Sequence, residues 1–435
     1  MSSGQIALGA RLRDRPFETF LSHAHVDKAQ SDQLFQWLSQ KADVKVWYDA
    51  DVIRRGTPLV RQLENGVSQS RGLILLLSKS SLESGWVQQE LDMAHLQKSF
   101  DPNFRIICIR TDASAVPAYL ATYPWIEAPD GKLSVDDAVT LLSSLECDQP
   151  TVDYPSPRDV YFSATWQTEQ KSQTVLPKAV SELLMLQGFR LVGDSRDQQG
   201  FIGGNRVRDI LQSCGGCVAV LPHRGEGTTS NYIIHEVEMA AREKLPTLVF
   251  IEHEVVCELP KNVAVCRLND SLGNELPGDL KAVIAKHVAE FSEQWQPAAF
   301  PHWVFYAKEF KPGFDAVEQA IIRLVRSITG MPCVFGDDIR EGDIPSAIVQ
   351  AIKNSFLTIC DISGQKLNTC IEAGVALGAG KSPILLMEGE RTSSQIPFMF
   401  RSRQNWFYQD SLELVALLRR LVRPYRRRII EPQQF

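Results

Sequence analysis

The sequence predicts an α/β protein of three consecutive flavodoxin-like domains, each a parallel sheet covered by helices. Three observations lead to this prediction. The chain has 435 residues, a length that corresponds to about three domains of ordinary size. Short, continuously apolar segments alternate with amphipathic segments of helical period, which is typical of βαβ crossovers. One series of segments also occurs three times, once in each third of the chain.

Each repeat runs through the same series. A short apolar strand opens it, and a polar loop and an amphipathic helix follow. A second helix leads into a second apolar strand, and the next helix carries a glutamate near its start. A further apolar strand closes the repeat. The opening strands are predicted at 17–21, 160–163 and 303–306, and the three glutamates are Glu90, Glu236 and Glu372.

Proline-rich segments separate the repeats. Residues 147–157 and 294–301 are the predicted linkers, so we expect domains at 1–150, 157–296 and 302–435. In open parallel sheets, ligands bind beyond the carboxyl ends of the strands. A glutamate repeated at that edge suggests a nucleotide or sugar site. The alternative is that each glutamate only stabilises the start of its helix.

The composition argues against several classes of protein. The chain holds 46 basic and 52 acidic residues, a net charge of −6, which argues against a general nucleic-acid binder. No apolar run approaches the ~20 residues of a membrane helix, and the N-terminus lacks a signal-peptide core. The nine cysteines are odd in number and partly lie in apolar runs, which suggests free thiols in a reducing cytosol. We expect a cytoplasmic protein without a membrane, metal or specific nucleic-acid partner.

Four segments of the first third follow one another in an order typical of one family. They are Phe20-Leu-Ser-His-Ala-His-Val-Asp-Lys28, Val46-Trp-Tyr-Asp49, Asp51-Val-Ile-Arg-Arg-Gly56 and Ser84-Gly-Trp-Val-Gln-Gln-Glu90-Leu91. Through them, residues 17–147 resemble a TIR (Toll/interleukin-1 receptor) domain of the bacterial type. Many such domains cleave NAD⁺ at the nicotinamide–ribose bond. The resemblance therefore implies this activity, with NAD⁺ as the substrate and no cofactor.

The resemblance implies that Glu90 is catalytic and that Trp86 contacts the substrate. In the family, the essential glutamate opens the helix after the third strand, and an aromatic residue precedes it by four positions. Glu90 and Trp86 have this spacing, which places them on one face of a helix. Cleaving a bond to a cationic leaving group needs little acid assistance, whereas a carboxylate stabilises the oxocarbenium-like ribose. The indole of Trp86 suits stacking on the nicotinamide ring.

Five further residues are candidates for binding the substrate. Ser22 and His23 follow the first strand, where a phosphate or ribose fits, although His23 has the alternative of a solvated loop residue. Asp49 ends the second strand. Arg54 and Arg55 lie on a segment that looks like the family's BB loop, which packs on a neighbouring subunit in active TIR assemblies. A solvated turn is the alternative for both arginines.

Three segments of the last third also follow a family order: Cys360-Asp-Ile-Ser363, Leu367-Asn368 and Glu372-Ala-Gly-Val-Ala-Leu-Gly378. Through them, the third domain resembles TIR-like nucleotide-binding domains and nucleoside deoxyribosyltransferases, in which the corresponding glutamate is the nucleophile. The further acidic residues of the transferases are not clearly placed here, which favours ligand binding over transfer. The candidates for binding a signal ligand are Asp361, Asn368 and Glu372, with Tyr232 and Glu236 of the middle domain, which repeat the spacing of Trp86 and Glu90.

Together, these expectations predict that the protein is a bacterial antiphage effector. A nucleotide-derived activating ligand would bind the C-terminal domains and drive self-association of the TIR domains into an oligomer or filament, and the TIR domain would then consume NAD⁺. The product is left open between ADP-ribose and a cyclic form. Two alternatives remain, a TIR assembly scaffold without catalysis and a transferase that works through Glu372. The basic run 419–428 is interpreted as a solvated tail, with a contact to phosphate, RNA or an acidic subunit as the alternative.

Overall fold

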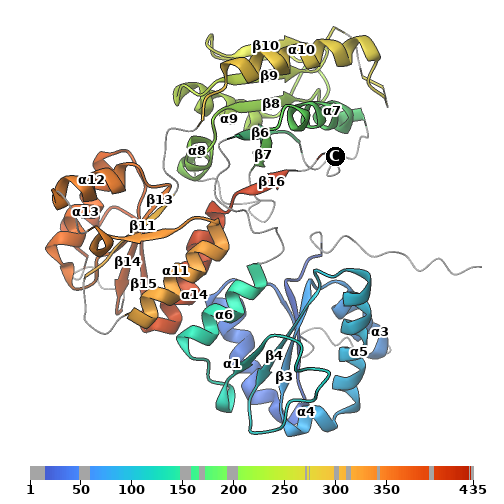
Figure 1. Ribbon diagram of the computed structural model, residues 1–435, viewed down its shortest axis with the longest axis vertical. Coiled ribbons are helices and arrows are strands. Elements are labelled where there is room, and N and C mark those ends of the chain that lie inside the picture. The colour runs from blue at the N-terminus through green and yellow to red at the C-terminus, as the bar shows by residue number, and fades with distance from the viewer. Residues whose placement is uncertain are drawn as a thin grey trace, which may run out of the picture.

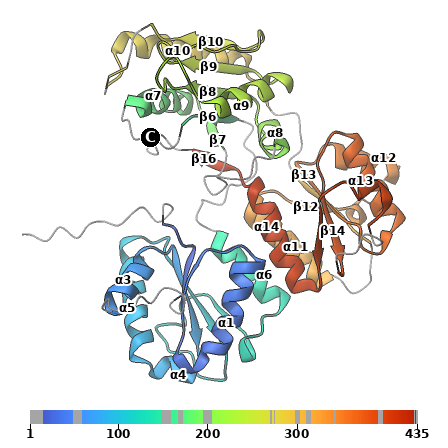
Figure 2. The same ribbon diagram turned by 180° about the vertical axis from the view of Figure 1, so that it is seen from behind.

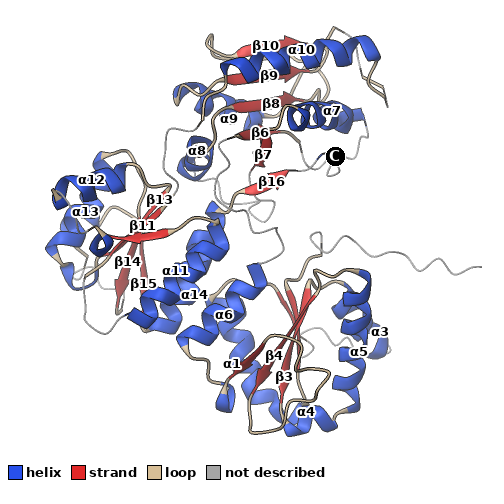
Figure 3. Cartoon of the chain, viewed as in Figure 1, coloured by secondary structure: helices blue, strands red, loops and turns tan. Residues whose placement is uncertain are grey.

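The computed structural model describes residues 15–48, 59–146, 158–165, 172–193, 204–269, 272–273, 275–297, 303–309, 315–339, 343–390, 396–430 and 432. Over these residues the chain forms three α/β domains, coloured blue to teal, green to yellow and orange to red in Figure 1. Helices flank the sheets in each domain, as Figure 3 shows. The predicted fold class is confirmed, whereas the exact bounds 1–150, 157–296 and 302–435 stay predictions.

The first domain alternates strands and helices. Its strands are β1 (Thr19–Ser22), β2 (Val46–Trp47), β3 (Gly72–Leu77), β4 (Arg105–Arg110) and β5 (Trp125–Glu127). Its helices are α1 (Lys28–Gln36) with its π-helical continuation η3 (Trp37–Lys41), α3 (Leu59–Ser68), α4 (Lys79–Glu83), α5 (Gly85–Phe100) and α6 (Val135–Glu146). The central strand β3 is apolar and buried along its whole length, because helices cover both faces of the sheet.

The middle domain repeats this alternation. Its strands are β6 (Asp159–Ser163), β7 (Arg190–Gly193), β8 (Cys217–Leu221), β9 (Thr247–Ile251) and β10 (Ala264–Arg267). Its helices are α7 (Ser172–Leu186), α8 (Gly204–Gln212), α9 (Asn231–Arg242) and α10 (Gly278–Gln294). Strands β8 and β9 are buried throughout, like their counterpart in the first domain.

The third domain follows the same plan. Its strands are β11 (Val304–Ala307), β12 (Cys333–Phe335), β13 (Leu357–Asp361), β14 (Ile384–Glu388) and β15 (Asn405–Tyr408). Its helices are α11 (Asp315–Thr329), α12 (Ile344–Lys353), α13 (Leu367–Gly378) and α14 (Ser411–Val422), and the short η9 (Arg423–Tyr425) follows α14.

The strand order is the same in all three domains. It runs β2-β1-β3-β4-β5, β7-β6-β8-β9-β10 and β12-β11-β13-β14-β15. These neighbouring strands are all parallel. This is the flavodoxin-like order, in which ligands bind beyond the carboxyl ends of the strands, where the order reverses. Each of the three glutamates lies on the helix that follows the third strand of its own domain.

The chain returns to the middle domain after it has completed the third. Strand β16 (Arg428–Ile430) pairs antiparallel with β7 and adds a sixth strand to the middle sheet, with Ile429 opposite Val192. Figure 2 shows this red strand next to the green domain. A three-residue strand is too short for a periodic pattern, so sequence analysis did not predict the crossing.

The first and third domains pack against each other through helices. Helix α6 lies against α11 and α14, as both Figure 1 and Figure 2 show. Buried apolar side chains of the two domains, such as Leu142 and Leu324, belong to one continuous core. The interface also carries an ion pair in which Lys41 Nζ lies 2.6 Å from Glu413 Oε1. The two domains therefore share apolar interior as well as surface charge.

Arginines of helix α14 and of the segment after it bind buried carboxylates of the first domain. Arg419 is fully buried, and its Nη2 lies 2.5 Å from Glu18 Oε2 and 2.7 Å from Glu146 Oε1. Arg423 Nη1 lies 2.8 Å from Glu18 Oε1, and Arg426 Nη1 lies 2.9 Å from Glu146 Oε2. We call these five residues the arginine–carboxylate network.

A neighbouring arginine binds the middle domain. Arg427 Nη1 lies 2.9 Å from Asp159 Oδ2, and both side chains are buried. Arg190 of the middle domain contacts the other oxygen of the same carboxylate at 2.6 Å. The interpretation of 419–428 as a solvated tail is therefore wrong for Arg419 and Arg427. Carboxylates of the other two domains neutralise these arginines in the interior.

Candidate active site in the first domain

Glu90 lies at the carboxyl edge of the first sheet, inside the domain. Its helix α5 begins after Ser84, whose side chain accepts a hydrogen bond from the backbone N–H of Val87 and so caps the helix. One turn later, Glu90 reaches the end of β1, where Ser22 Oγ donates to Glu90 Oε2 at 2.5 Å. Glu90 is only 7% exposed and Ser22 only 1%. The fold thus brings together two predicted site residues from distant parts of the sequence.

The two aromatic candidates differ in their surroundings. Trp86 lies in the first turn of α5 and is 48% exposed, four positions before the buried Glu90. His23 follows Ser22 and is partly buried, with its ring centroid 5.3 Å from that of Tyr48. Trp86 is therefore accessible in the turn that precedes Glu90, whereas the ring of His23 lies against Tyr48, the residue after the second strand.

Hydrogen bonds join the residues that follow β2 and β3 to the segment after β1, which includes the start of helix α1. Tyr48, directly after β2, accepts from Ser31 Oγ at 2.7 Å and donates to Asp32 Oδ1 at 2.6 Å. The bond from Tyr48 lowers the pKa of the Asp32 carboxyl. Ser78, directly after β3, donates to Asp27 Oδ2 at 2.6 Å. These bonds hold the carboxyl edge of the sheet around the pair of Ser22 and Glu90.

Asp49, Arg54 and Arg55 lie outside the described residues. Tyr48 is the last described residue before this segment, and the description resumes at Leu59 in α3. The expected contacts of all three residues with the substrate, and of the two arginines with a neighbouring subunit, stay predictions.

The middle domain repeats the contact between serine and glutamate. Ser163, the last residue of β6, donates to Glu236 Oε2, and the hydroxyl of Tyr161 donates to Oε1. Glu236 is 3% exposed, whereas Tyr232, in the first turn of α9, is 45% exposed. Both carboxylate oxygens of Glu236 thus accept hydrogen bonds that join α9 to β6. A role for Glu236 and Tyr232 in binding a signal ligand stays a prediction.

The third domain lacks this serine. Its first strand ends in Ala307, where β1 and β6 end in serine. Glu372 is partly exposed, and its Oε1 lies so near Gly336 that a Cβ there would approach it to 3.3 Å. Asn368 is exposed in the first turn of α13. Glu372 therefore lacks the strand-end hydroxyl that contacts the glutamate in the other two domains.

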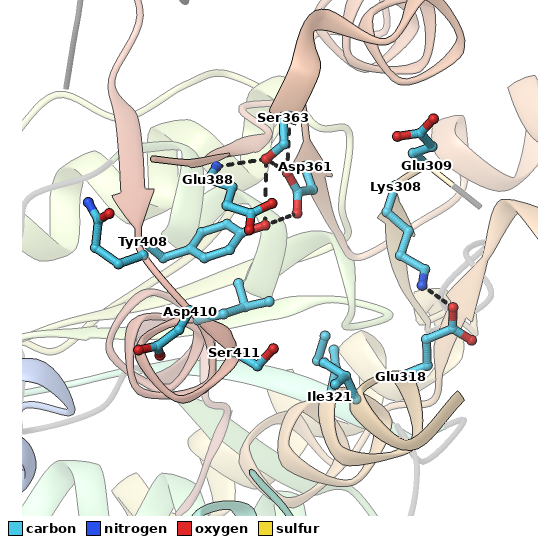
Figure 4. A pocket seen from close by; sticks show the side chains of 13 residues that line it. Lys308, Glu309, Glu318, Ile321, Asp361, Ser363, Glu388, Tyr408, Asp410 and Ser411 are labelled. Atoms are coloured by element: carbon cyan, nitrogen blue, oxygen red, sulfur yellow. Dashed lines mark hydrogen bonds and ion pairs between the residues drawn. The ribbon is translucent and has the colours of Figure 1, made fainter. Parts of the chain in front are cut away.

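Asp361 lines a pocket of about 290 Å³ at the carboxyl ends of the third sheet, drawn in Figure 4. Tyr408 donates its hydroxyl hydrogen to Asp361 Oδ2 at 2.6 Å, and Ser363 donates to Oδ1. The backbone N–H of Glu388 donates to Ser363 Oγ at 2.7 Å. Asn368 and Glu372 do not line this pocket, so the fold separates them from Asp361. Sequence reasoning did not identify Tyr408, because its partner lies on another strand.

The described part of the chain offers neither a metal centre nor a membrane-spanning helix. Within it, no three His, Cys, Asp or Glu side chains gather closely enough to hold a metal ion. No helix in these segments combines the length and the apolar character needed to cross a bilayer. The eight cysteines of the described residues are free, and burial raises the pKa of the Cys108 thiol to about 11.

The comparisons with known proteins identify the first domain. Residues 19–142 match the family model of the TIR domain. The chain thus carries a TIR domain in its N-terminal third, as the sequence resemblance implied. The resemblance of the last third to nucleotide-binding and transferase domains, and the nucleotide-binding role expected of the middle domain, stay predictions.

Curated relatives match a short stretch of the chain. "NAD(+) hydrolase TcpA" of Theionarchaea archaeon (strain DG-70-1) is 40% identical over 77 residues, 18% of this chain and 23% of the relative. "NAD(+) hydrolase PdTIR" of Paracoccus denitrificans (strain Pd 1222) is 36% identical over 77 residues, 18% of this chain and 26% of the relative. "Probable 2' cyclic ADP-D-ribose synthase TcpO" of Methanobrevibacter olleyae is 26% identical over 81 residues, 19% of this chain and 24% of the relative. The chain therefore matches about a quarter of the length of each relative.

Proposed function

We propose that the chain is a TIR-domain effector that cleaves NAD⁺ at the bond between nicotinamide and ribose. The observation that carries the proposal is the contact between Ser22 and Glu90, which holds a buried carboxylate at the carboxyl edge of the TIR sheet. The names of the relatives support the choice of substrate, because two are NAD⁺ hydrolases and one is a probable cyclic ADP-ribose synthase.

In this proposal Glu90 is the catalytic residue. As nicotinamide leaves, it takes both electrons of the glycosidic bond and becomes neutral, while positive charge develops on C1′ and the ring oxygen of the ribose. The carboxylate of Glu90 stabilises that charge. Ser22 acts through Glu90, because its hydroxyl directs the carboxylate, so we class it as a positioning residue. The half-exposed indole of Trp86 provides a surface on which the nicotinamide ring stacks.

The second reactant decides the product. When water attacks C1′, the oxygen–carbon bond forms, a proton is released and the product is ADP-ribose. When a hydroxyl group of the same molecule attacks instead, the product is a cyclic ADP-ribose. The relatives include proteins named for each outcome, so both products are measured in the test below.

Contacts of helix α14 support control of the TIR domain by the third domain. Near its start, Leu414 lines the pocket that contains Asp361, and near its end Arg419 binds Glu18. Glu18 directly precedes β1, the strand that ends at Ser22. We propose that a nucleotide-derived signal shifts α14 and thereby changes how Glu90 is held. We further propose that the signal arises during phage infection and that activation requires self-association of the TIR domains.

The purified full chain tests the assignment of Glu90. Nicotinamide, ADP-ribose and cyclic ADP-ribose are measured by chromatography, with and without metabolites extracted from phage-infected cells. We expect NAD⁺ cleavage by the wild type and none by Glu90→Gln, with an unchanged midpoint of thermal unfolding. Glu83→Gln, an exposed position on α4, is the matched control and keeps wild-type turnover. Equal turnover by the wild type and Glu90→Gln would refute the assignment of Glu90, and no turnover by the activated wild type would leave the scaffold alternative.

The transferase alternative has its own test. Ala307 stands where the first strands of the other two domains end in serine, so no strand-end hydroxyl directs the carboxylate of Glu372. This makes Glu372 a weaker candidate for a nucleophile than Glu90 is for a catalytic carboxylate. We expect no exchanged nucleoside when the chain is mixed with a deoxynucleoside and a free base. Exchange that disappears in Glu372→Ala would establish the transferase instead.

A further inference from the structure

Acidic side chains outnumber basic ones in the lining of the pocket around Asp361. Its walls come from the carboxyl ends of four parallel strands and from helices α11 and α14 (Figure 4). Among the lining residues that the structure describes, Lys308 is basic and five are acidic. The acidic residues are Glu309, Glu318, Asp361, Glu388 and Asp410. Glu309 pairs with Lys366, whose Nζ lies 2.7 Å from Glu309 Oε1, so with Lys308 two basic side chains face five carboxylates. Such an excess of one sign in a cleft attracts ions of the opposite sign and repels those of the same sign.

The basic side chain in this lining is already neutralised. Lys308 Nζ pairs with the carboxylate of Glu318, as Figure 4 shows, and it lies 5.5 Å from the ring centroid of Phe335. Only 11% of the Lys308 side chain is exposed. A phosphate group that entered the pocket would therefore meet carboxylates without gaining a free ammonium partner from the described lining.

The helix that faces the pocket is not an open anion site either. Helix α14 starts at the pocket, and a helix N-terminus ordinarily suits a phosphate. Here Asp410 Oδ1 accepts from the backbone N–H of Glu413 at 2.8 Å and caps the helix. Glu413 Oε2 in turn accepts from the backbone N–H of Gln409 at 2.7 Å. Asp410 thus occupies one N–H of the first turn, and the carboxylates of Asp410 and Glu413 place negative charge at the end of the helix where an anion would bind.

The pocket has a polar side and an apolar side. On the polar side, burial raises the pKa of the Tyr408 phenol and the Asp361 carboxylate raises it further, so Tyr408 keeps its proton and donates to Asp361. The carboxylates of Asp361 and Glu388 act as hydrogen-bond acceptors. The apolar side is formed by Val317, Ile321 and Leu414. A ligand that matches both sides has several O–H or N–H donors and one apolar face.

We infer that this pocket binds a small phosphate-free molecule, neutral or positively charged, that presents several O–H or N–H donors. The volume of about 290 Å³ suits a molecule the size of a nucleoside. The inference rests on the proposed function in one respect, because it narrows the nucleotide-derived signal to a compound without phosphate. Since α14 forms one wall, occupancy of the pocket acts on the helix that carries Arg419.

Direct binding to the full chain tests the inference without any NAD⁺ cleavage. Isothermal titration is carried out with adenosine and AMP, a pair that differs only in the phosphate, and with putrescine, a small cation. We expect adenosine or putrescine to bind, and AMP to bind at least tenfold more weakly than the tighter of the two. Tighter binding of adenosine identifies the ligand as a neutral polyhydroxy compound, and tighter binding of putrescine identifies it as an amine. Equal or tighter binding of AMP would overturn the inference, as would the absence of binding by all three probes at millimolar concentration.

Variants at the mouth of the pocket test which residues select the ligand. Glu388 is exposed at the end of β14, so its replacement leaves the core intact. We expect Glu388→Lys to lower the affinity for the tighter of adenosine and putrescine at least threefold. The ratio between that affinity and the affinity for AMP should become smaller. Glu293→Lys, an exposed glutamate on α10, is the control with an equal change of net charge and leaves both affinities unchanged. Identical affinities in all three proteins would place the binding elsewhere and overturn the inference. If the wild type binds a probe as expected but does not cleave NAD⁺, only the proposed function is contradicted.

Discussion

Arg419 Nη2 and Glu18 Oε2 lie 2.5 Å apart, across the interface between the last helix of the third domain and the residue that precedes the first strand of the TIR domain. Burial by itself would raise the pKa of Glu18, but Arg419 and Arg423 lower it to about 2. The folded-state pKa thus lies below the unfolded value of about 4.3. The stability that this group contributes is present above pH ~4 and is lost as the pH falls towards 2.

The first prediction concerns the arginine–carboxylate network. Arg419→Met leaves the carboxylates of Glu18 and Glu146 buried with one cation fewer, which typically costs about 3–5 kcal/mol. We expect the first transition in urea unfolding to move to markedly lower denaturant. Arg420→Met is the control on the same helix, because Arg420 is only partly buried and lies over the ring of Trp406 at 5.5 Å. Similar midpoints for the two variants would show that the network contributes little.

The second prediction concerns Ser22. Ser22→Ala removes the hydrogen bond to Glu90, and a bond to a charged group contributes about 1.5–3 kcal/mol. We expect kcat for NAD⁺ cleavage to fall by about tenfold or more, with a smaller change in KM, and Ser22→Thr to restore part of the activity. The conservative variant separates a positioning role from a general loss of structure.

Ser163→Ala is the matched control for that experiment. It removes the equivalent bond to Glu236 in the middle domain. We expect NAD⁺ cleavage by the activated protein to stay within about twofold of the wild type, because Glu236 belongs to a different sheet. A loss as large as that of Ser22→Ala would contradict a role of Ser22 that is specific to the catalytic carboxylate.

The third prediction concerns pH. Burial raises the pKa of Asp209 in α8 to about 7, although Lys381 and Arg208 lower it. The folded-state pKa lies above the unfolded value of about 3.9. This group therefore contributes stability below pH ~4, and that contribution is lost as the pH rises to 7. We expect Asp209→Asn to be more resistant to urea than the wild type at pH 8. The advantage should shrink towards pH 5, whereas the exposed Asp279→Asn should show no such trend.

The fourth prediction concerns self-association. If a neighbouring TIR domain completes the site, NAD⁺ cleavage per mole of chain rises with protein concentration in the presence of infected-cell metabolites, and light scattering reports a larger mass. We expect Arg54→Glu to lower both. Arg242→Glu, with a side chain that is 72% exposed on the middle domain, should lower neither. A fully active species with the mass of one chain would contradict the prediction.

Local patterns were sufficient to predict the architecture. The apolar strands and the glutamate after each third strand lie where the sequence repeats predicted them, because parallel βαβ units have a regular order along the chain. The strand-end serine was also visible, since Ser22 and Ser163 both end the first strand of their domain. The contact of each with its glutamate follows from the strand order.

Contacts between the domains were not predictable in this way. The run from Arg419 to Arg427 is indistinguishable from a solvated basic face until Glu18, Glu146 and Asp159 are placed beside it. Those carboxylates are hundreds of residues away or lie in other domains, and no local period relates them to the arginines. Sequence reasoning also did not show that Glu372 lies outside the pocket that Asp361 lines, because no local pattern relates the two side chains.

The antiparallel strand β16 imposes an order on biosynthesis. While the ribosome makes the third domain, the outer edge of β7 has no partner from this chain, because residues 428–430 have not yet been synthesised. An open strand edge is a template for pairing with other chains. The middle domain therefore reaches its complete sheet only after the third domain has emerged. Ribosomes that stall within the last domain release a product whose middle domain is open to aggregation.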